Sequence, residues 1–303
     1  MSFVRSLRRM LWSLDTRLSR HDAVVDEPVA EPPPNRYQEI RDFVWSIDLP
    51  TPEAREYLKK HLHRIARTLT LVPEPFQTKR VLELGAYMQM TPALQCVLNY
   101  EEVRGAYYGT LGRTDEKRLT ANGIEVFRCF VDHFDAEKDI YPYPDGEFDA
   151  VLACEIFEHL LHDPMHMLLE IRRVLVDGGR LILTTPNCSS YSTVANVLLQ
   201  IGHPQLHAMY ANPLRPDAEK DIPHVREYTP QELADVIRRA GYEVEYLFTE
   251  KIEGYNSDLF IKAVLQRNGY PTGLRGEQTY CVARKVAGAQ VDRYPFWLYE
   301  GFV

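Results

Sequence analysis

A carboxylate and a glycine stand at the end of a predicted strand, the place where α/β proteins commonly bind a ligand. Residues 80–84 read as a short buried strand that contains Glu83 and is followed by Gly85. A carboxylate at this place can reach a ligand held by the loop, and glycine lets the backbone approach that ligand closely. Thr91 and Pro92 then suit a helix start, whose free N–H groups would face the same crevice. By itself, this turn fits a structural role equally well.

A second segment carries groups that suit proton transfer. Residues 148–154 read as a strand, and a Glu-x-x-Glu-His sequence, residues 155–159, follows it directly. An imidazole can take a proton from a hydroxyl near neutral pH, so His159 is the first candidate for a catalytic base. His224 and Tyr228 are second candidates, because the segment before them would fold over an acceptor. A hydrogen-bonded, structural histidine is the alternative for His159.

The spacing of several histidines raises a metal site, which the rest of the sequence does not favour. The histidines at three- and four-residue spacings are His159, His162, His166, His203 and His207. Asp163 and Pro164 interrupt any single helix through the first three. The Glu-His order differs from the H-E-x-x-H zinc helix, and no cysteine pair accompanies it. We therefore expect no metal.

The elements that position these groups follow an alternating pattern. From Arg80 onward, short β-branched and apolar runs alternate with helical runs, which is typical of βαβ units. The expected strands cover residues 80–84, 103–108, 126–130, 148–154, 180–185, 242–248 and 278–284. Helices fit between them, for example over residues 164–175 with Asp163 as N-cap. The sequence predicts an α/β fold with a Rossmann-like, seven-stranded, mostly parallel sheet flanked by helices.

Taken together, these motifs resemble those of class I S-adenosylmethionine-dependent methyltransferases. The resemblance is to a bacterial group whose fourth strand runs into Glu-x-x-Glu-His and whose fifth strand ends in Thr-Thr-Pro-Asn, here residues 184–187. Residues 134–137, 143–149 and 224–230 add further matches, and the similarity covers about residues 78–285. It implies that S-adenosylmethionine is the cofactor and that a methyl group is transferred.

The resemblance also implies roles for individual residues. Glu83, Gly85 and Ala86 would line the amino acid and ribose portions of the cofactor. Asp135 and Ala136 would contact the adenine, Glu155 would lie beside the sulfonium, and His159 near the methyl-transfer centre.

Two positions depart from the family pattern. Tyr87 replaces a usual second glycine, and it must either swing away or narrow the pocket. The acidic residue expected after the second strand is absent, with no carboxylate before Asp115. Losing that contact would weaken binding by about 1.5 to 3 kcal/mol. Tyr107 would stack or hydrogen-bond in its place.

Composition narrows the class of protein further. The chain has 303 residues, and its 43 acidic residues exceed its 35 basic residues by eight, which argues against nucleic acid as a partner. Five scattered cysteines without a C-x-x-C pair favour free thiols in a reducing compartment. No apolar run reaches the roughly 18 to 20 residues that a membrane span needs. We expect a cytoplasmic protein.

The chain divides into three parts in sequence. Residues 1–35 form a basic amphipathic arm and a proline-rich linker, and the arm at residues 1–20 suits either an anionic membrane surface or packing on protein. Residues 36–77 form a helical N-terminal extension, with Thr51 as an N-cap. Residues 78–303 form the methyltransferase domain, in which residues 188–229 are expected to be a substrate lid.

The leading interpretation is a methyltransferase that acts on a small-molecule or glycan-like acceptor, most simply at a hydroxyl. The alternative is a non-catalytic protein that keeps the fold for binding or scaffolding, which Tyr87 and the missing acidic residue would favour. A nicotinamide-dependent oxidoreductase is disfavoured, because residues 85–90 lack G-x-G-x-x-G.

Overall fold

The fold is described from a computed structural model, which places residues 32, 35–49, 51–121, 123–207, 223–252 and 258–299. The basic arm expected at residues 1–20 lies outside the described residues, as does nearly all of the proline-rich linker.

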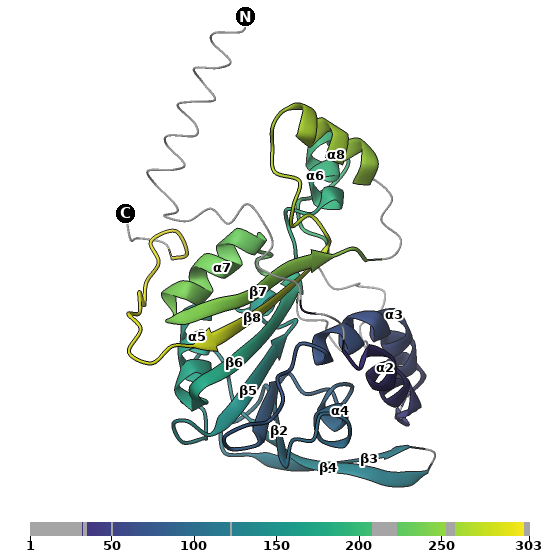
Figure 1. The fold of residues 1–303 in the computed structure, drawn as a ribbon, viewed down its shortest axis with the longest axis vertical. Helices are drawn as coiled ribbons and strands as arrows, with labels where there is room; N and C mark the ends of the chain where they lie inside the picture. Colours follow the sequence, from purple (N-terminus) through teal and green to yellow (C-terminus); the bar gives the residue numbers. More distant parts are fainter. Residues whose placement is uncertain are drawn as a thin grey trace, which may run out of the picture.

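One mixed sheet of eight strands forms the centre of the described structure (Figure 1). The strand order is β3-β4-β2-β1-β5-β6-β8-β7. β4, β2, β1, β5 and β6 are parallel, whereas β3 and β8 run antiparallel to their neighbours. The strands are β1 (Arg80–Leu84), β2 (Glu102–Tyr107), β3 (Thr114–Ala121), β4 (Ile124–His133), β5 (Phe148–Cys154), β6 (Leu175–Pro186), β7 (Tyr242–Glu250) and β8 (Gln278–Lys285).

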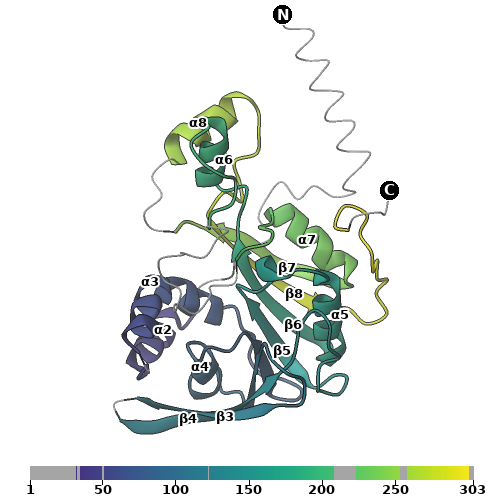
Figure 2. The same cartoon turned by 180° about the vertical axis from the view of Figure 1, so that it is seen from behind.

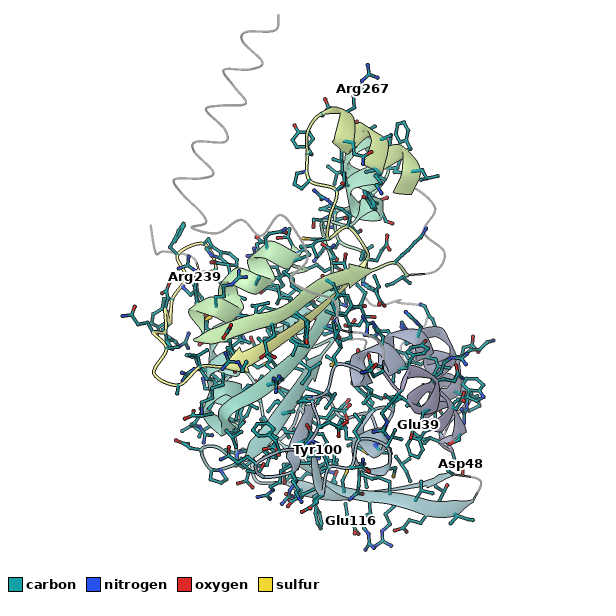
Figure 3. All side chains as sticks on the ribbon, viewed as in Figure 1. Glu39, Asp48, Tyr100, Glu116, Arg239 and Arg267 are labelled. Atoms are coloured by element: carbon teal, nitrogen blue, oxygen red, sulfur yellow. The ribbon has the colours of Figure 1, made fainter. Side chains whose placement is uncertain are left out.

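The seven predicted strands are present, but the expected total of seven is wrong because β3 adds an eighth. β3 forms an antiparallel hairpin with β4, and it stands where a helix was expected between β2 and β4. Only Leu119 of β3 is buried. The strand is otherwise rich in charged residues, so it lacks the alternation of apolar and polar residues by which a half-buried strand is predicted. Asp48, near the far end of this hairpin in Figure 3, accepts hydrogen bonds from Thr120 Oγ1 and the Gly123 N–H.

Helices cover the two faces of the sheet, each over its own apolar cluster (Figures 1 and 2). α5 (Pro164–Val174) and α7 (Pro230–Arg239) pack on one face. α2 (Tyr37–Ser46), α3 (Pro52–Leu69) and α4 (Thr91–Cys96) pack on the other. Two predicted N-caps are confirmed, since Thr51 accepts from the Ala54 N–H and Asp163 accepts from the His166 N–H. The expectation that Thr91 caps a helix is wrong, because Thr91 is the first residue of α4 and its hydroxyl donates to Glu83 instead.

The helical extension is fastened to the sheet through the segment that follows α3. Asp149, a fully buried residue of β5, accepts hydrogen bonds from the backbone N–H groups of residues 76–79 at 2.7 to 3.2 Å. These bonds hold the pKa of Asp149 below its ordinary value against the opposing effect of burial. A second contact joins α3 itself to the sheet, because Arg67 near the end of α3 forms an ion pair with Glu250, the last residue of β7, at 2.8 Å. α3 is therefore held at the edge of the sheet where the parallel strands end.

A pair of short helices projects from the body of the molecule (Figures 1 and 2). α6 (Tyr191–Leu198) packs against α8 (Asp258–Arg267) around Ala195, Ile261 and Leu265. α6 belongs to the expected lid at 188–229, of which residues 188–207 and 223–229 are described. Among the described helices, none is both long enough and apolar enough to cross a membrane.

Candidate active site

Polar groups follow the carboxyl ends of four neighbouring parallel strands. Asp135 comes after β4, Tyr107 ends β2, Gly85 comes after β1, and Glu155 comes after β5. Strands lie about 4.8 Å apart in a sheet, so the four strand ends span roughly 14 Å. The chain leaves β1 toward β2 and later returns to β5 on its other side, which makes β1 and β5 the switch point of this sheet. This arrangement suits an elongated ligand along the edge.

The turn after β1 leaves space for a close approach. Gly85 has a φ of +66°, and a Cβ added there would lie 3.1 Å from Cδ1 of Ile156. Glu83, 2% exposed, accepts a hydrogen bond from Thr91 Oγ1 at 2.6 Å. Burial raises the pKa of Glu83 to about 8, so this carboxyl is protonated at neutral pH. The Ala86 N–H donates to the carbonyl of residue 106.

Tyr87 lies at the mouth of the turn and does not fill it. Its side chain is 59% exposed, and its hydroxyl accepts a hydrogen bond from the Tyr107 hydroxyl at 3.0 Å. The two rings meet nearly at right angles, 5.2 Å apart. Asp115, the first carboxylate after β2, pairs with Arg113 and with His133. Tyr107, hydrogen-bonded to Tyr87, is therefore the polar side chain at the carboxyl end of β2.

The loop after β4 holds its carboxylate by local bonds. Asp135 accepts a hydrogen bond from the Glu137 N–H at 3.0 Å and pairs with Lys138 at 3.3 Å. The Ala136 carbonyl accepts from the Tyr141 hydroxyl at 3.2 Å. Both groups lie at the same sheet edge as Tyr107, because β4 is the parallel neighbour of β2.

Glu155 is bound on both of its oxygens. Thr184 Oγ1 and Gln278 Nε2 donate to Oε1 at 2.7 and 2.8 Å, and Arg64 of α3 pairs with Oε2 at 2.6 Å. Burial alone would raise the pKa of Glu155, but the Arg64 guanidinium and these hydrogen bonds hold it below its ordinary value. Glu155 also has a φ of +56°, a left-handed conformation that is uncommon for a residue with a side chain.

A cavity of about 50 Å³ lies between α3 and the ends of β1, β5 and β6. Its lining includes Tyr57, Arg64, Thr68, Gly85, Glu155 and Thr184. The volume equals that of a few water molecules, so it matches only part of a nucleoside cofactor. The α3 residues were not predicted from the sequence. Arg64 and Thr68 lie four residues apart beside the apolar face of α3 formed by Leu58, Leu62, Ile65 and Leu69, so the helical pattern gave no signal that they face a cavity.

The predicted catalytic histidines lie together, beside the Glu155 turn. The rings of His159 and His224 are 4.7 Å apart and nearly perpendicular, and the His207 ring lies 4.4 Å from that of His224. His224 Nδ1 donates to Glu227 at 2.9 Å, and His159 Nδ1 donates to the Pro223 carbonyl at 3.2 Å. The structure thus brings together His159 and His207, which belong to the histidines noted for their spacing in the sequence, and His224, which does not.

Two other predicted residues lie apart from this cluster. Tyr228 is 3% exposed, and its ring packs on Phe157 at 4.8 Å. His166 uses Nε2 to bond the Asp139 carbonyl on the α5 side.

Two buried carboxylates adjoin the histidines. Glu227 accepts from His224 and from the backbone N–H groups of residues 206 and 207. Although burial opposes ionisation, the adjacent histidines and these N–H groups lower the pKa of Glu227 to about 2. Glu158 is fully buried, and its Oε2 accepts from Thr185 Oγ1 at 2.9 Å. Its Oε1 has no hydrogen-bond partner in the described part of the chain.

Comparison with known proteins finds similarity to a family model over the segment from β3 to β6. Residues 113–183 match the model of a methyltransferase domain. The chain is 31% identical over 104 residues to a Mycolicibacterium smegmatis protein named "Probable S-adenosylmethionine-dependent methyltransferase", covering 34% of this chain and 32% of that protein. It is 30% identical over 111 residues to the uncharacterized protein YafE of Escherichia coli, covering 37% of this chain and 46% of that protein. The matched segments thus span less than half the length of these relatives.

Solved structures also match this chain, at lower sequence identity. A chain from the complex that contains the Haloferax volcanii Trm112 methyltransferase activator is 16% identical and has a TM-score of 0.49. The similarity covers 83% of this chain and 99% of that one.

The family match and the named relative show that this segment of the chain is similar to methyltransferase domains. The turn at Gly85 keeps a space that a Cβ would narrow, and Tyr87 stands outside it.

Proposed function

We propose that this protein transfers a methyl group from S-adenosylmethionine to a hydroxyl of a small-molecule or glycan-like acceptor. The observation that carries the proposal is the meeting of two groups of residues at one sheet edge. The row from Asp135 to Glu155 suits the nucleoside and amino acid of the cofactor, and the histidine pair His159 and His224 adjoins the Glu155 end of that row.

Within this proposal, each residue of the row has a place along the cofactor. Gly85 and Ala86 would lie against its amino acid and ribose, together with the buried carboxyl of Glu83. Tyr107 would take the place of the missing ribose acid, and Asp135 and Ala136 would contact the adenine. Glu155 would lie beside the sulfonium.

The bound cofactor supplies a methyl group that its sulfonium already activates. The chain must therefore hold the acceptor in line, with its oxygen about 3 to 3.5 Å from the methyl carbon. Tyr57 and Arg64 of α3 line the cavity, and the Arg64 guanidinium donates a hydrogen bond to the Tyr57 hydroxyl at 2.9 Å, so α3 would cover one side of the reacting atoms.

The acceptor hydroxyl has to lose a proton, and the histidine cluster is the group placed for it. His159 is the first candidate and His224 the second. Tyr228, the other second candidate of the sequence, is less suited because its side chain is buried and packs on Phe157, apart from the cluster.

Changing His159 to Ala tests this placement. We expect turnover to fall by at least about 10², while the affinity for S-adenosylhomocysteine stays within a few fold, since His159 lies on the acceptor side. Radiolabelled methyl transfer to a panel of hydroxylated acceptors measures the first quantity, and calorimetry measures the second.

The matched control is His162→Ala, three residues away on the exposed surface. This variant should keep the turnover of the natural chain. Equal turnover in His159→Ala and His162→Ala would remove His159 from the chemistry.

We also propose that the basic arm at residues 1–20 contacts an anionic membrane surface. Its alternating apolar and basic residues support this placement. Deleting residues 1–30 should abolish binding to phosphatidylglycerol vesicles and leave the melting temperature of the body unchanged. Vesicle binding that survives the deletion would end this proposal.

A further inference from the structure

The histidine cluster contains the donor set of a metal site. We propose that Glu158, His159 and His224 bind one divalent transition-metal ion on the acceptor side of the active site. The inference rests on the proposed function, because it assigns the way in which that site handles the acceptor hydroxyl.

The three residues offer donor atoms in one place. One ligand atom from each of Glu158, His159 and His224 lies within 4.8 Å of the other two. In a tetrahedral site, donors about 2.1 Å from the ion lie about 3.4 Å apart. Binding an ion would therefore draw the three residues together by up to about 1.4 Å, a movement that the partly exposed imidazoles of His159 and His224 allow.

The unpaired oxygen of Glu158 points to a missing ligand. Glu158 is fully buried, and Oε1 has no hydrogen-bond partner in the described residues, although Oε2 is held by Thr185. Leaving a buried carboxyl oxygen without a partner is unfavourable, and buried acidic groups are normally paired or coordinate a metal. A cation between Glu158 and the two imidazoles would satisfy that oxygen.

Both imidazoles are oriented for coordination by their second nitrogen. Nδ1 of His224 donates to the Glu227 carboxylate, and Nδ1 of His159 donates to the Pro223 carbonyl. A hydrogen bond from Nδ1–H to a carboxylate or carbonyl fixes the tautomer in which Nε2 carries the lone pair. This arrangement accompanies almost all metal-binding histidines.

A second group, His207, His224 and Glu227, lies equally close together. Its carboxylate is less suited to bind a metal, because Glu227 already accepts from His224 and from two backbone N–H groups. Glu158 has a carboxyl oxygen, Oε1, that can bind an ion, whereas both oxygens of Glu227 already accept hydrogen bonds. We therefore place Glu227 behind His224 as an orienting residue.

Two imidazoles and one carboxylate favour Zn²⁺, Fe²⁺ or Mn²⁺ over the alkaline-earth cations, and they leave coordination positions open. An acceptor hydroxyl bound at an open position would lose its proton more readily. In the transfer step, the hydroxyl oxygen forms a bond to the methyl carbon while the carbon–sulfur bond breaks and sulfur keeps the electron pair. The proton passes to water. With the ion bound, His159 holds the ion, and the deprotonation assigned to His159 in the proposed function takes place at the ion.

Titration of the metal-stripped full chain with ZnCl₂ and CoCl₂, in the absence of cofactor and acceptor, tests the site. We expect one ion per chain by calorimetry, with visible d–d absorption for Co²⁺. Glu158→Gln, His224→Ala and His159→Ala should each weaken binding by at least about tenfold. His162→Ala is the matched control and should bind as the natural chain does. Circular dichroism spectra show which variants keep the fold.

Absence of binding to the natural chain would overturn the proposal. So would a loss of binding in His207→Ala with none in Glu158→Gln and His159→Ala, since that pattern assigns the ion to the other group. S-adenosylhomocysteine binding, measured on the same samples, separates this inference from the proposed function. A chain that binds S-adenosylhomocysteine but no metal ion overturns only the metal site.

Discussion

At the scale of single residues, Glu83 shows how burial assigns a chemical state. Its side chain lies inside the sheet, and its hydrogen-bonding partner is the hydroxyl of Thr91 at the start of α4. With no cation beside it, burial is the main influence, and it raises the pKa of Glu83 to about 8. In the native state, Glu83 therefore keeps its proton up to about pH 8. In the unfolded chain, the same carboxyl releases its proton above its ordinary pKa of 4.5.

This difference makes stability depend on pH. Between about pH 4.5 and pH 8 the native state binds more protons than the unfolded state, so the free energy of unfolding falls as pH rises. Glu83→Gln removes the titrating group. We expect the variant to gain on the order of 3 kcal/mol relative to the natural chain between about pH 5 and pH 8, measured by urea unfolding.

Glu56→Gln makes the same substitution at an exposed position on α3 and serves as its control. Its difference from the natural chain should be the same at both pH values. A Glu83→Gln difference that is also independent of pH would show that Glu83 is ionised in the native state.

At the scale of elements, α3 does more than extend the fold. Through Arg64 it neutralises Glu155, and through Arg67 it reaches the end of β7. α3 lines the cavity and also supplies the positive charge that pairs with Glu155. Both the shape and the charge of the site therefore depend on how α3 packs against the sheet.

Arg64→Ala tests this dependence. The change leaves Glu155 buried without its cation, and breaking such a pair typically destabilises a protein by about 3 to 5 kcal/mol. We expect a loss of about 3 kcal/mol in the free energy of unfolding and at least tenfold weaker S-adenosylhomocysteine binding. Lys60→Ala, which removes an exposed cation from the same helix, should change neither quantity. Unaltered affinity in Arg64→Ala would mean that α3 plays no part in the cofactor site.

The elements also show where sequence patterns succeed and fail. The strands β1, β5 and β6 were predictable, because buried parallel strands are continuous apolar runs bounded by turn residues. β3 was not, since its charged side chains face solvent and its pairing with β4 supplies the backbone hydrogen bonds. The role of Arg64 was hidden for another reason, because its partner Glu155 lies about ninety residues away in the sequence.

At the scale of the whole molecule, segments far apart in the sequence meet at one edge of the sheet. The sheet order brings the turns after β4, β2, β1 and β5 into one row, and the segment that precedes α7 brings His224 to His159. The local motifs around Gly85 and Glu155 were readable in the sequence. The proximity of His159, His207 and His224 could not be predicted from the sequence, because it depends on how the chain after β6 folds back toward the turn after β5.

The proposed reaction requires that this edge binds S-adenosylmethionine, although Tyr87 stands where a glycine was expected and β2 offers no acid for the ribose. Calorimetric titration of the full chain with S-adenosylhomocysteine tests that requirement most directly. We predict one molecule bound per chain, with a dissociation constant between about 1 and 100 μM and a matching rise in melting temperature. Neither heat nor a shift in melting temperature at about 1 mM ligand would contradict the account, and the fold would then serve a purpose other than methyl transfer.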